Sequence, residues 1–138
     1  MRLADDEARR RFATARVARL ATVSGQGQPH VVPCTFAVDG EVIYSAVDAK
    51  PKSTTNLRRL RNIAANGRVT VLADHYAEDW STLWWVRADG QASIIDDPLS
   101  MAAPIGLLAA RYPQYVTSPP GGPVVAIRVT HWTGWSAA

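Results

Sequence analysis

The sequence predicts a mainly β protein: a small closed or split β-barrel of about six strands, flanked by two to three helices. Three observations support this prediction. Apolar residues recur with period two in several short segments, turn-forming residues separate these segments, and few stretches have helical spacing. No internal repeat or linker divides the 138 residues. We therefore expect a single domain over residues 1–138.

The N-terminal third predicts a helix and the first strands. Residues 5–15 have a mixed charged surface typical of a short helix, and residues 16–23 follow as a strand. Every second residue of the segment 30–38 is apolar, which indicates a half-buried strand. Asp39-Gly40 is a strong hairpin signal, so residues 41–47 are predicted to form the return strand.

The rest of the chain alternates helical and extended patterns. It predicts, in order, a helix over 53–65, strands over 68–73 and 82–95, a helix over 98–111 and a strand over 124–132. The first of these helices has Leu57, Leu60 and Ala64 on one face, and Asn66-Gly67 should end it with a left-handed cap. Asp97 is the expected N-cap of the second.

Composition excludes several classes of protein. The chain is 47% hydrophobic with a net charge of +3, which is too apolar and too weakly charged for a disordered protein. No stretch approaches the ~20 apolar residues of a membrane span, and no apolar signal core opens the chain, so we expect a cytoplasmic protein. The single Cys34 excludes an intrachain disulfide, and the three histidines lack metal-ligand spacing, so no metal site is predicted.

The most informative segment is basic. Lys50, Lys52 and Ser53 come at the predicted start of the 53–65 helix, where free backbone N–H groups favour an anion such as a phosphate. Arg58 points away from the buried face of this helix, while Arg59 and Arg61 lie at its margins. The alternative interpretation is an ordinary capped helix with a solvated basic face.

Tryptophans are concentrated in the second half of the chain. Trp84 and Trp85 are adjacent on one predicted strand, so their side chains face opposite sides. One can enter the core while the other lines a groove, where an indole is a good platform for a flat conjugated ring. The alternative is a tryptophan-rich core or a dimer contact.

The order of these segments resembles a known family. The motifs are Arg19-Leu20-Ala21-Thr22-Val23, Pro29-His30-Val31-Val32-Pro33-Cys34-Thr35-Phe36, Lys50-Pro51-Lys52, Leu57-Arg58-Arg59-Leu60-Arg61-Asn62-Ile63 and Trp132-Thr133-Gly134-Trp135. Together they resemble the pyridoxamine 5′-phosphate oxidase-like split β-barrel family, which has an FMN-binding-like fold. The chain looks most like the branch of deazaflavin (coenzyme F420)-dependent oxidoreductases of actinobacteria.

The resemblance implies a homodimer with two cofactor sites at the subunit interface. The deazaflavin ring would lie along the strand carrying Val32, Pro33 and Cys34. The phosphate would be bound by Lys50, Lys52 and Ser53, or by Arg59 in the alternative register. The basic helix would face the acidic oligoglutamate tail of the cofactor, since arginine suits carboxylates. The partner chain would contribute Trp85, Arg87 and Trp135.

The expected function is therefore reduction of a small electron-poor molecule, such as an enone, quinone, tetrapyrrole or nitro compound, by a hydride from reduced F420. No nucleophile with a dedicated base is present, so the cofactor would carry the chemistry. No catalytic residue is assigned, and Tyr44, His75 and bound water are candidate proton donors. The alternatives are an FMN-binding protein and a non-catalytic F420 carrier. A nucleic-acid-binding module is the weakest reading, and neither nucleic acid nor membrane is an expected partner.

Overall fold

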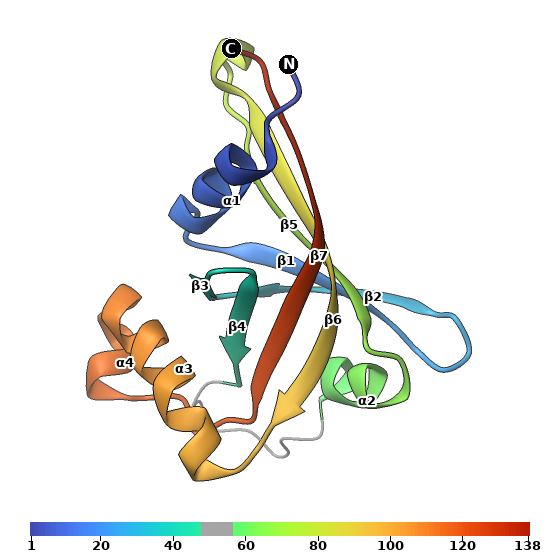
Figure 1. The fold of residues 1–138 in the computed structure, drawn as a ribbon, viewed down its shortest axis with the longest axis vertical. Coiled ribbons are helices and arrows are strands. Elements are labelled where there is room, and N and C mark those ends of the chain that lie inside the picture. The colour runs from blue at the N-terminus through green and yellow to red at the C-terminus, as the bar shows by residue number, and fades with distance from the viewer. Residues whose placement is uncertain (48–56) are drawn as a thin grey trace.

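A single antiparallel sheet organises the chain (Figure 1). The structure, a computed structural model, describes residues 1–47 and 57–138. The described strands are β1 (Ala18–Val23), β2 (Pro29–Cys34), β3 (Ala37–Asp39), β4 (Val42–Ala46), β5 (Arg68–His75), β6 (Trp84–Ile95) and β7 (Val124–Ser136). The described helices are α1 (Asp5–Thr14), α2 (Arg58–Ala65), α3 (Pro98–Arg111), α4 (Gln114–Thr117) and the 3₁₀ turn η1 (Trp80–Thr82). The mainly β barrel is confirmed, with one strand and one helix more than expected.

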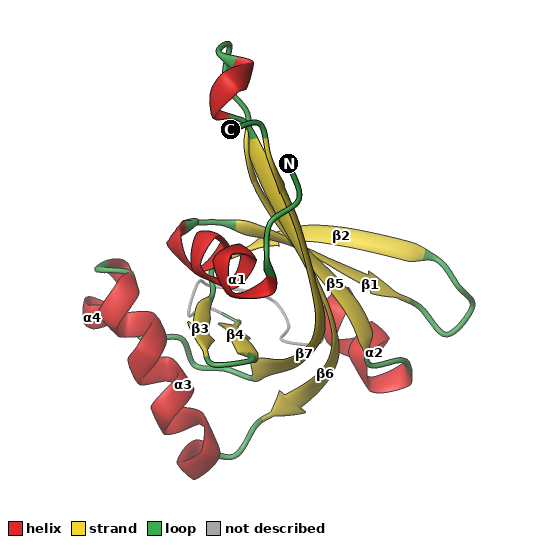
Figure 2. Ribbon diagram, turned by 45° about the horizontal axis from the view of Figure 1, so that its top comes forward, coloured by secondary structure: helices red, strands yellow, loops and turns green. Residues whose placement is uncertain are grey.

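The sheet curls into a split barrel in the order β2-β1-β5-β6-β7-β4-β3 (Figure 2). Its two edge strands, β2 and β3, follow each other in sequence. The single strand expected over 30–38 is therefore wrong, because Thr35 and Phe36 leave the ladder. Their backbone groups bond to side chains instead: the Phe36 N–H donates to the Tyr112 hydroxyl at 3.1 Å, and the Ser45 hydroxyl donates to the Thr35 carbonyl at 2.7 Å.

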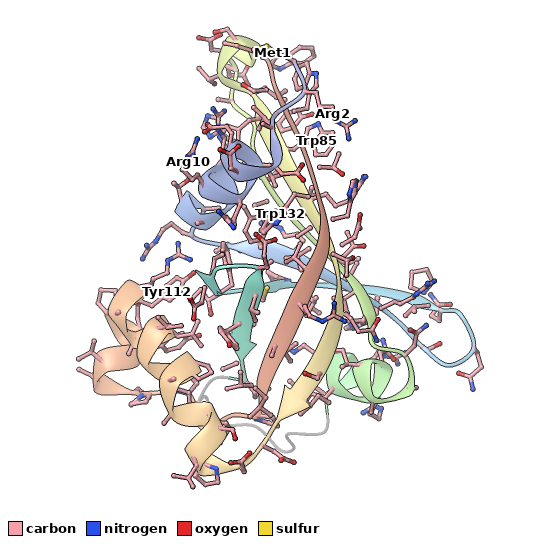
Figure 3. The ribbon with its side chains drawn as sticks, viewed as in Figure 1. Met1, Arg2, Arg10, Trp85, Tyr112 and Trp132 are labelled. Carbon is pink, nitrogen blue, oxygen red and sulfur yellow. The ribbon has the colours of Figure 1, made fainter. Side chains whose placement is uncertain are left out.

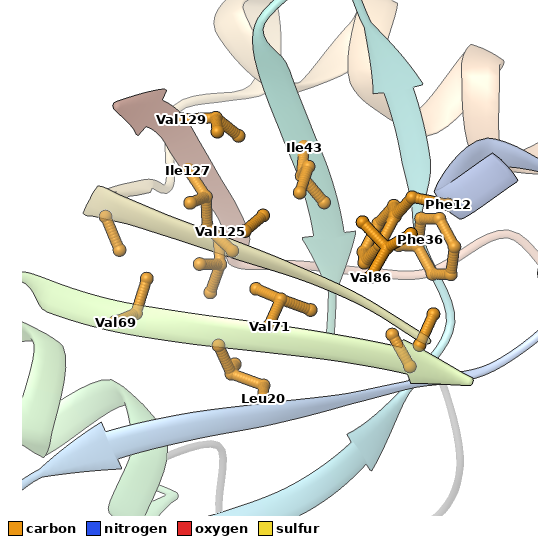
Figure 4. Packing of buried hydrophobic residues seen from close by; sticks show 14 of the residues in the cluster. Phe12, Leu20, Phe36, Ile43, Val69, Val71, Val86, Val125, Ile127 and Val129 are labelled. Carbon is orange, nitrogen blue, oxygen red and sulfur yellow. The ribbon is translucent and has the colours of Figure 1, made fainter. Parts of the chain in front are cut away.

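The core fills the inside of the barrel (Figure 4). Leu20, Val71 and Val86 come from three neighbouring strands and are completely or almost completely buried. Phe12 of α1 closes one end, where its ring lies 4.7 Å from that of Phe36 and 5.6 Å from that of Trp132. Burial of these large side chains contributes roughly 1.5–3 kcal/mol each, which makes α1 part of the barrel.

The strands β6 and β7 extend beyond the barrel as an arm that also carries η1 and both chain termini (Figure 1). A register shift between Asp89 and Gly90 interrupts the regular pairing of β6 with β7. The prediction that the last strand ends at residue 132 was too short. Gly134 continues the strand and allows a close approach of Leu3 and Ala8, whose side chains an added Cβ atom would meet at 3.0 and 3.2 Å.

The helix α2 begins later than expected. Its N-cap is Leu57, in an extended conformation, so the prediction of a helix start at residue 53 is wrong. The face that it buries consists of Leu60, Asn62 and Ile63, whereas Ala64 is exposed. No left-handed cap ends the helix, because Asn66 is extended. Gly67 instead allows close packing: an added Cβ would lie 2.8 Å from the Ala92 carbonyl oxygen.

The helices α3 and α4 pack beside β3 and β4. Asp97 caps α3 as predicted, accepting a 3.0 Å hydrogen bond from the Ser100 N–H. The short α4 was not predicted, because four residues carry no periodicity. In the described part of the chain, no helix combines the length and apolar character needed to cross a bilayer.

Candidate functional site

The outer side of the sheet carries a row of side chains that the strand pairing aligns. Arg19 of β1 lies opposite Leu72 of β5, and Leu72 lies opposite Arg87 of β6. Residues directly opposite each other in an antiparallel pair lie on the same side of the sheet. On the other side, Leu20, Val71 and Ala88 form the matching row of the core. The two arginines and Leu72 therefore share the solvent-facing side.

This outer side is hollowed into a groove of about 490 Å³. Its middle strand is β5, which contributes Thr70, Leu72 and Asp74, with Tyr76 just beyond the strand end. The neighbouring strands supply the two sides, and these lining residues are Arg19, Ala21 and Val31 on one side and Trp85 and Arg87 on the other.

Charge in the groove is mainly positive. Within the described ranges, no carboxylate lies within ion-pair distance of Arg19. The Arg87 guanidinium lies 5.8 Å from the centroid of a Trp85 ring, and its Nε is 3.8 Å from an Asp89 carboxylate oxygen. Asp74 is the one carboxylate among the lining residues. The groove thus combines apolar surface, aromatic rings and two cations.

The three residues predicted to lie along the cofactor ring are divided between the two sides of β2. Pro33 pairs with Arg19 and is exposed on the outer side, where it flanks the groove. Val32 and Cys34 are half-buried and pack against the core. A flat ring at this strand would therefore contact Pro33 from outside, or Val32 and Cys34 where β2 forms the edge of the split barrel.

Burial raises the pKa of the Cys34 thiol to about 11. A hydrogen bond with Ser45 and the positive charges of Arg59 and Arg19 act in the opposite direction but are outweighed. Cys34 is consequently neutral at pH 7 and is no nucleophile.

The arginines of the basic helix differ in their exposure. Arg58 and Arg61 are exposed and Arg59 is half-buried. The helix is fixed to β1 by a buried hydrogen bond of 2.9 Å from the Asn62 amide to the Thr22 hydroxyl. Lys50, Lys52 and Ser53, the predicted phosphate ligands, lie outside the described residues.

Trp85, Arg87 and Trp135, the residues expected to reach the site from a partner chain, lie together on the outer side of β6 and β7. Trp85 lies opposite Trp135 in the β6–β7 ladder (Figure 3 labels Trp85), and Arg87 is two residues further along β6. Trp84 faces the other way and packs against the core, as the strand alternation predicted. Sequence reasoning named Trp85 and Arg87 but missed Arg19, Leu72 and the other residues that line the groove. Alternation of buried and exposed positions in 68–75 indicates the side of the strand on which Leu72 lies. Only the pairing of β1 with β5 brings Leu72 next to Arg19.

Comparisons with known proteins agree with this architecture. The family model for pyridoxamine 5′-phosphate oxidase matches residues 4–136. A segment of 56 residues, 41% of this chain, is 38% identical to 5a,11a-dehydrotetracycline/5a,11a-dehydrooxytetracycline reductase of Streptomyces rimosus. That match spans only 38% of the length of the reductase.

Solved structures share the fold at low sequence identity. A conserved hypothetical protein of Mycobacterium tuberculosis has a TM-score of 0.74 at 21% identity, covering 98% of this chain and 86% of its own. An FAD-binding protein of Mesorhizobium loti has a TM-score of 0.72 at 22% identity, covering 97% and 93%. The haem storage protein of Vibrio cholerae has a TM-score of 0.67 at 19% identity, covering 94% of each chain. The match of the family model over nearly the whole sequence decides the assignment: this chain belongs to the pyridoxamine 5′-phosphate oxidase family.

Proposed function

We propose that this protein is an oxidoreductase that uses reduced coenzyme F420 to reduce an electron-poor small molecule. The observation that carries the proposal is the basic side of α2, where Arg58 and Arg61 are exposed and Arg59 is half-buried. A flavin mononucleotide ends in one phosphate, whereas F420 carries a phosphate followed by an acidic tail. A row of arginines suits the longer anion.

The residues present fit such a cofactor. The positive charge of Arg59 acts on Cys34, which packs against the core with Val32 at the apolar edge strand β2. In the proposal Val32, Pro33 and Cys34 contact the ring, Arg58 and Arg61 face the tail, and Lys50, Lys52 and Ser53 or Arg59 hold the phosphate. The partial match to a reductase of Streptomyces rimosus supports reduction as the reaction class.

When bound, the cofactor supplies a hydride that adds to an electron-poor double bond. The chain itself supplies position and electrostatics. Arginine charges hold the anionic parts of the cofactor, and the apolar β2 edge excludes water from one side of the ring. The neutral Cys34 thiol neither attacks the ring nor adds a negative charge beside it.

A homodimer belongs to the same proposal. Val31, Leu72 and Trp135 are large apolar residues of the outer side that are 61%, 37% and 39% exposed. A second copy packed over this side would bury them and would bring its own Trp85, Arg87 and Trp135 to the site. A stable interface of this kind buries ~1,600 Å² in total. Sedimentation equilibrium at micromolar concentration tests the dimer, and a clean monomer contradicts the two-chain site.

The alternative cofactor is FMN, because the same cations would bind a flavin phosphate. Expression in a host that makes both F420 and flavins tests the choice, with the visible spectrum and mass of the co-purifying ligand as the readout. We expect F420. Bound FMN or FAD would contradict the proposal. Turnover of reduced F420 with a panel of enones, quinones and nitro compounds then separates a reductase from a carrier, which would oxidise none of them.

A further inference from the structure

We propose that the outer-side groove between β1, β5 and β6 is occupied by the arm tip of a second copy of this chain. The arm tip is the segment 74–83, which includes η1 at the end of the arm. In this contact the partner's Trp80 covers Leu72, and the partner's Glu78 forms an ion pair with Arg19. The inference rests on the homodimer of the proposed function and names the residues that join the two copies.

The arm tip presents a tryptophan to solvent from a well-supported turn (Figure 2). Trp80 is 72% exposed, although it belongs to the capped turn η1. The Asp79 carboxylate accepts hydrogen bonds from the Ser81 N–H at 3.0 Å and from the Ser81 hydroxyl at 2.6 Å. The carbonyl of the buried Leu83 accepts a 2.9 Å hydrogen bond from the Ala137 N–H, which ties the turn to the segment after β7. A large aromatic side chain on such a preorganised backbone is typical of an interface anchor.

The charge of the arm tip is negative. Segment 74–83 contains three carboxylates, Asp74, Glu78 and Asp79, and neither lysine nor arginine, although the whole chain has a net charge of +3. Glu78 is exposed, and among the described residues it forms no ion pair. Its carboxylate is therefore available to a cation of another molecule.

The groove supplies the matching charge. Arg19 is exposed, and no carboxylate in the described ranges forms an ion pair with it. Arg87 lies on the other side of Leu72, which is 37% exposed. Next along this row, Thr133 has a buried hydroxyl that finds no hydrogen-bond partner in the described part of the chain. A carboxylate beside an indole ring is the complement of such a basic surface with an apolar centre.

Both halves of the contact lie on the same chain, as a two-fold dimer requires. In an isologous interface each patch of one copy meets the other patch of its partner, so every contact occurs twice. Leu72 lies on β5, which ends at His75 and leads into the turn η1. A two-fold axis between the groove and the turn, near Trp85 and Trp135, would place each arm tip over the groove of the other copy. The groove of about 490 Å³ is large enough to receive an indole ring.

Charge reversal tests the pairing of Arg19 with the partner's Glu78. Sedimentation equilibrium of the full chain without cofactor gives the dissociation constant of the dimer. Arg19→Glu alone and Glu78→Arg alone should each raise this constant about ten-fold, because two repulsive contacts replace two attractive ones. In an equimolar mixture of the two variants, the mixed dimer again joins opposite charges at both contacts. The mixture should therefore associate within about three-fold of wild type.

Matched variants control for position and for exposure. Arg128→Glu reverses an exposed arginine of β7 outside the groove, so its mixture with Glu78→Arg should not restore association. Trp80→Ala should raise the dissociation constant about ten-fold or more. Leu99→Ala, which truncates a 91% exposed side chain on α3, should leave it unchanged. Circular dichroism checks that each variant folds.

A dimer that Arg19→Glu, Glu78→Arg and Trp80→Ala leave unchanged would overturn the inference while the homodimer stands. A mixture that associates no better than its separate components would overturn it as well, and a monomeric wild type would overturn both the inference and the homodimer. Titration of the wild type with F420 keeps the cofactor separate. If the mixture restores the dimer but the protein does not bind F420, the interface stands and the proposed function fails.

Discussion

The amide of Asn62 donates a 2.9 Å hydrogen bond to the hydroxyl of Thr22, and both side chains are buried. Asn62 lies on α2 and Thr22 on β1, so this bond joins the basic helix to the sheet. A helix of eight residues has little stability of its own, and its position depends on such tertiary contacts. The orientation of Arg58, Arg59 and Arg61 follows from this attachment.

Loss of this bond should destabilise the protein. Asn62→Ala leaves the Thr22 hydroxyl without its donor in the core, which costs ~1–3 kcal/mol in the free energy of unfolding. Thr22→Val removes the other partner with little change of shape. The two substitutions should be less damaging together than the sum of their separate effects, as urea unfolding of all four proteins would show. Simple additivity would mean that the bond does not hold α2 in place.

The exposed arginines of α2 should recognise the cofactor tail. Arg58→Glu or Arg61→Glu should weaken F420 binding more when the glutamate tail is longer. Exposed ion pairs contribute only ~0–1 kcal/mol and are screened by salt, so each effect should be modest. Fluorescence titration with short-tailed and long-tailed F420 measures this. Arg68→Glu, an exposed arginine on the outer side of β5, is the control. Equal losses for both tail lengths would place these arginines away from the tail.

Burial of Cys34 should make stability depend on pH in the alkaline range. Its pKa rises to about 11 in the folded protein, so between about pH 9 and pH 11 the unfolded chain binds fewer protons than the native one. The free energy of unfolding therefore falls as the pH rises, by up to ~1.4 kcal/mol per pH unit from this group. Below pH 8 the effect is absent. Urea unfolding at pH 8 and pH 10.5 should show a steeper fall for wild type than for Cys34→Ala, and parallel curves would disprove this effect.

Tyr112 should hold the two edges of the split barrel in place (Figure 3). Its hydroxyl accepts from the Phe36 N–H at 3.1 Å and lies 3.0 Å from the carbonyl oxygens of Arg16 and Phe36. Tyr112→Phe leaves the Phe36 N–H and the Arg16 carbonyl without this partner, while the Phe36 carbonyl keeps its hydrogen bond from Arg111. The substitution should lower the free energy of unfolding by ~1–3 kcal/mol. Tyr115→Phe is the matched control, because among the described residues its hydroxyl bonds only to the half-buried Thr35 side chain, at 2.8 Å. Thermal unfolding should rank Tyr112→Phe as clearly the less stable variant.

Local sequence patterns predicted most helices and strands, because hydrophobic periodicity and helix capping depend on residues that are close together in the sequence. The Asp97 cap and the opposite directions of Trp84 and Trp85 are examples. The break between β2 and β3 was not predictable in this way, since it depends on Tyr112, which is 76 residues away from Phe36. The groove was missed for the same reason: Arg19 and Leu72 meet only through the pairing of β1 with β5. The arginines of α2 were found because they lie within four residues of one another in the sequence.

The most direct test of the account is a side-by-side equilibrium titration of the cofactor-free protein with F420, FMN and FAD under one set of salt conditions. The basic side of α2 predicts that F420 binds at least ten-fold more tightly than either flavin, and that this preference shrinks in Arg58→Glu and at high salt. Binding of FMN or FAD as tightly as F420, with no effect of Arg58→Glu, would contradict the assignment of the chain to deazaflavin chemistry.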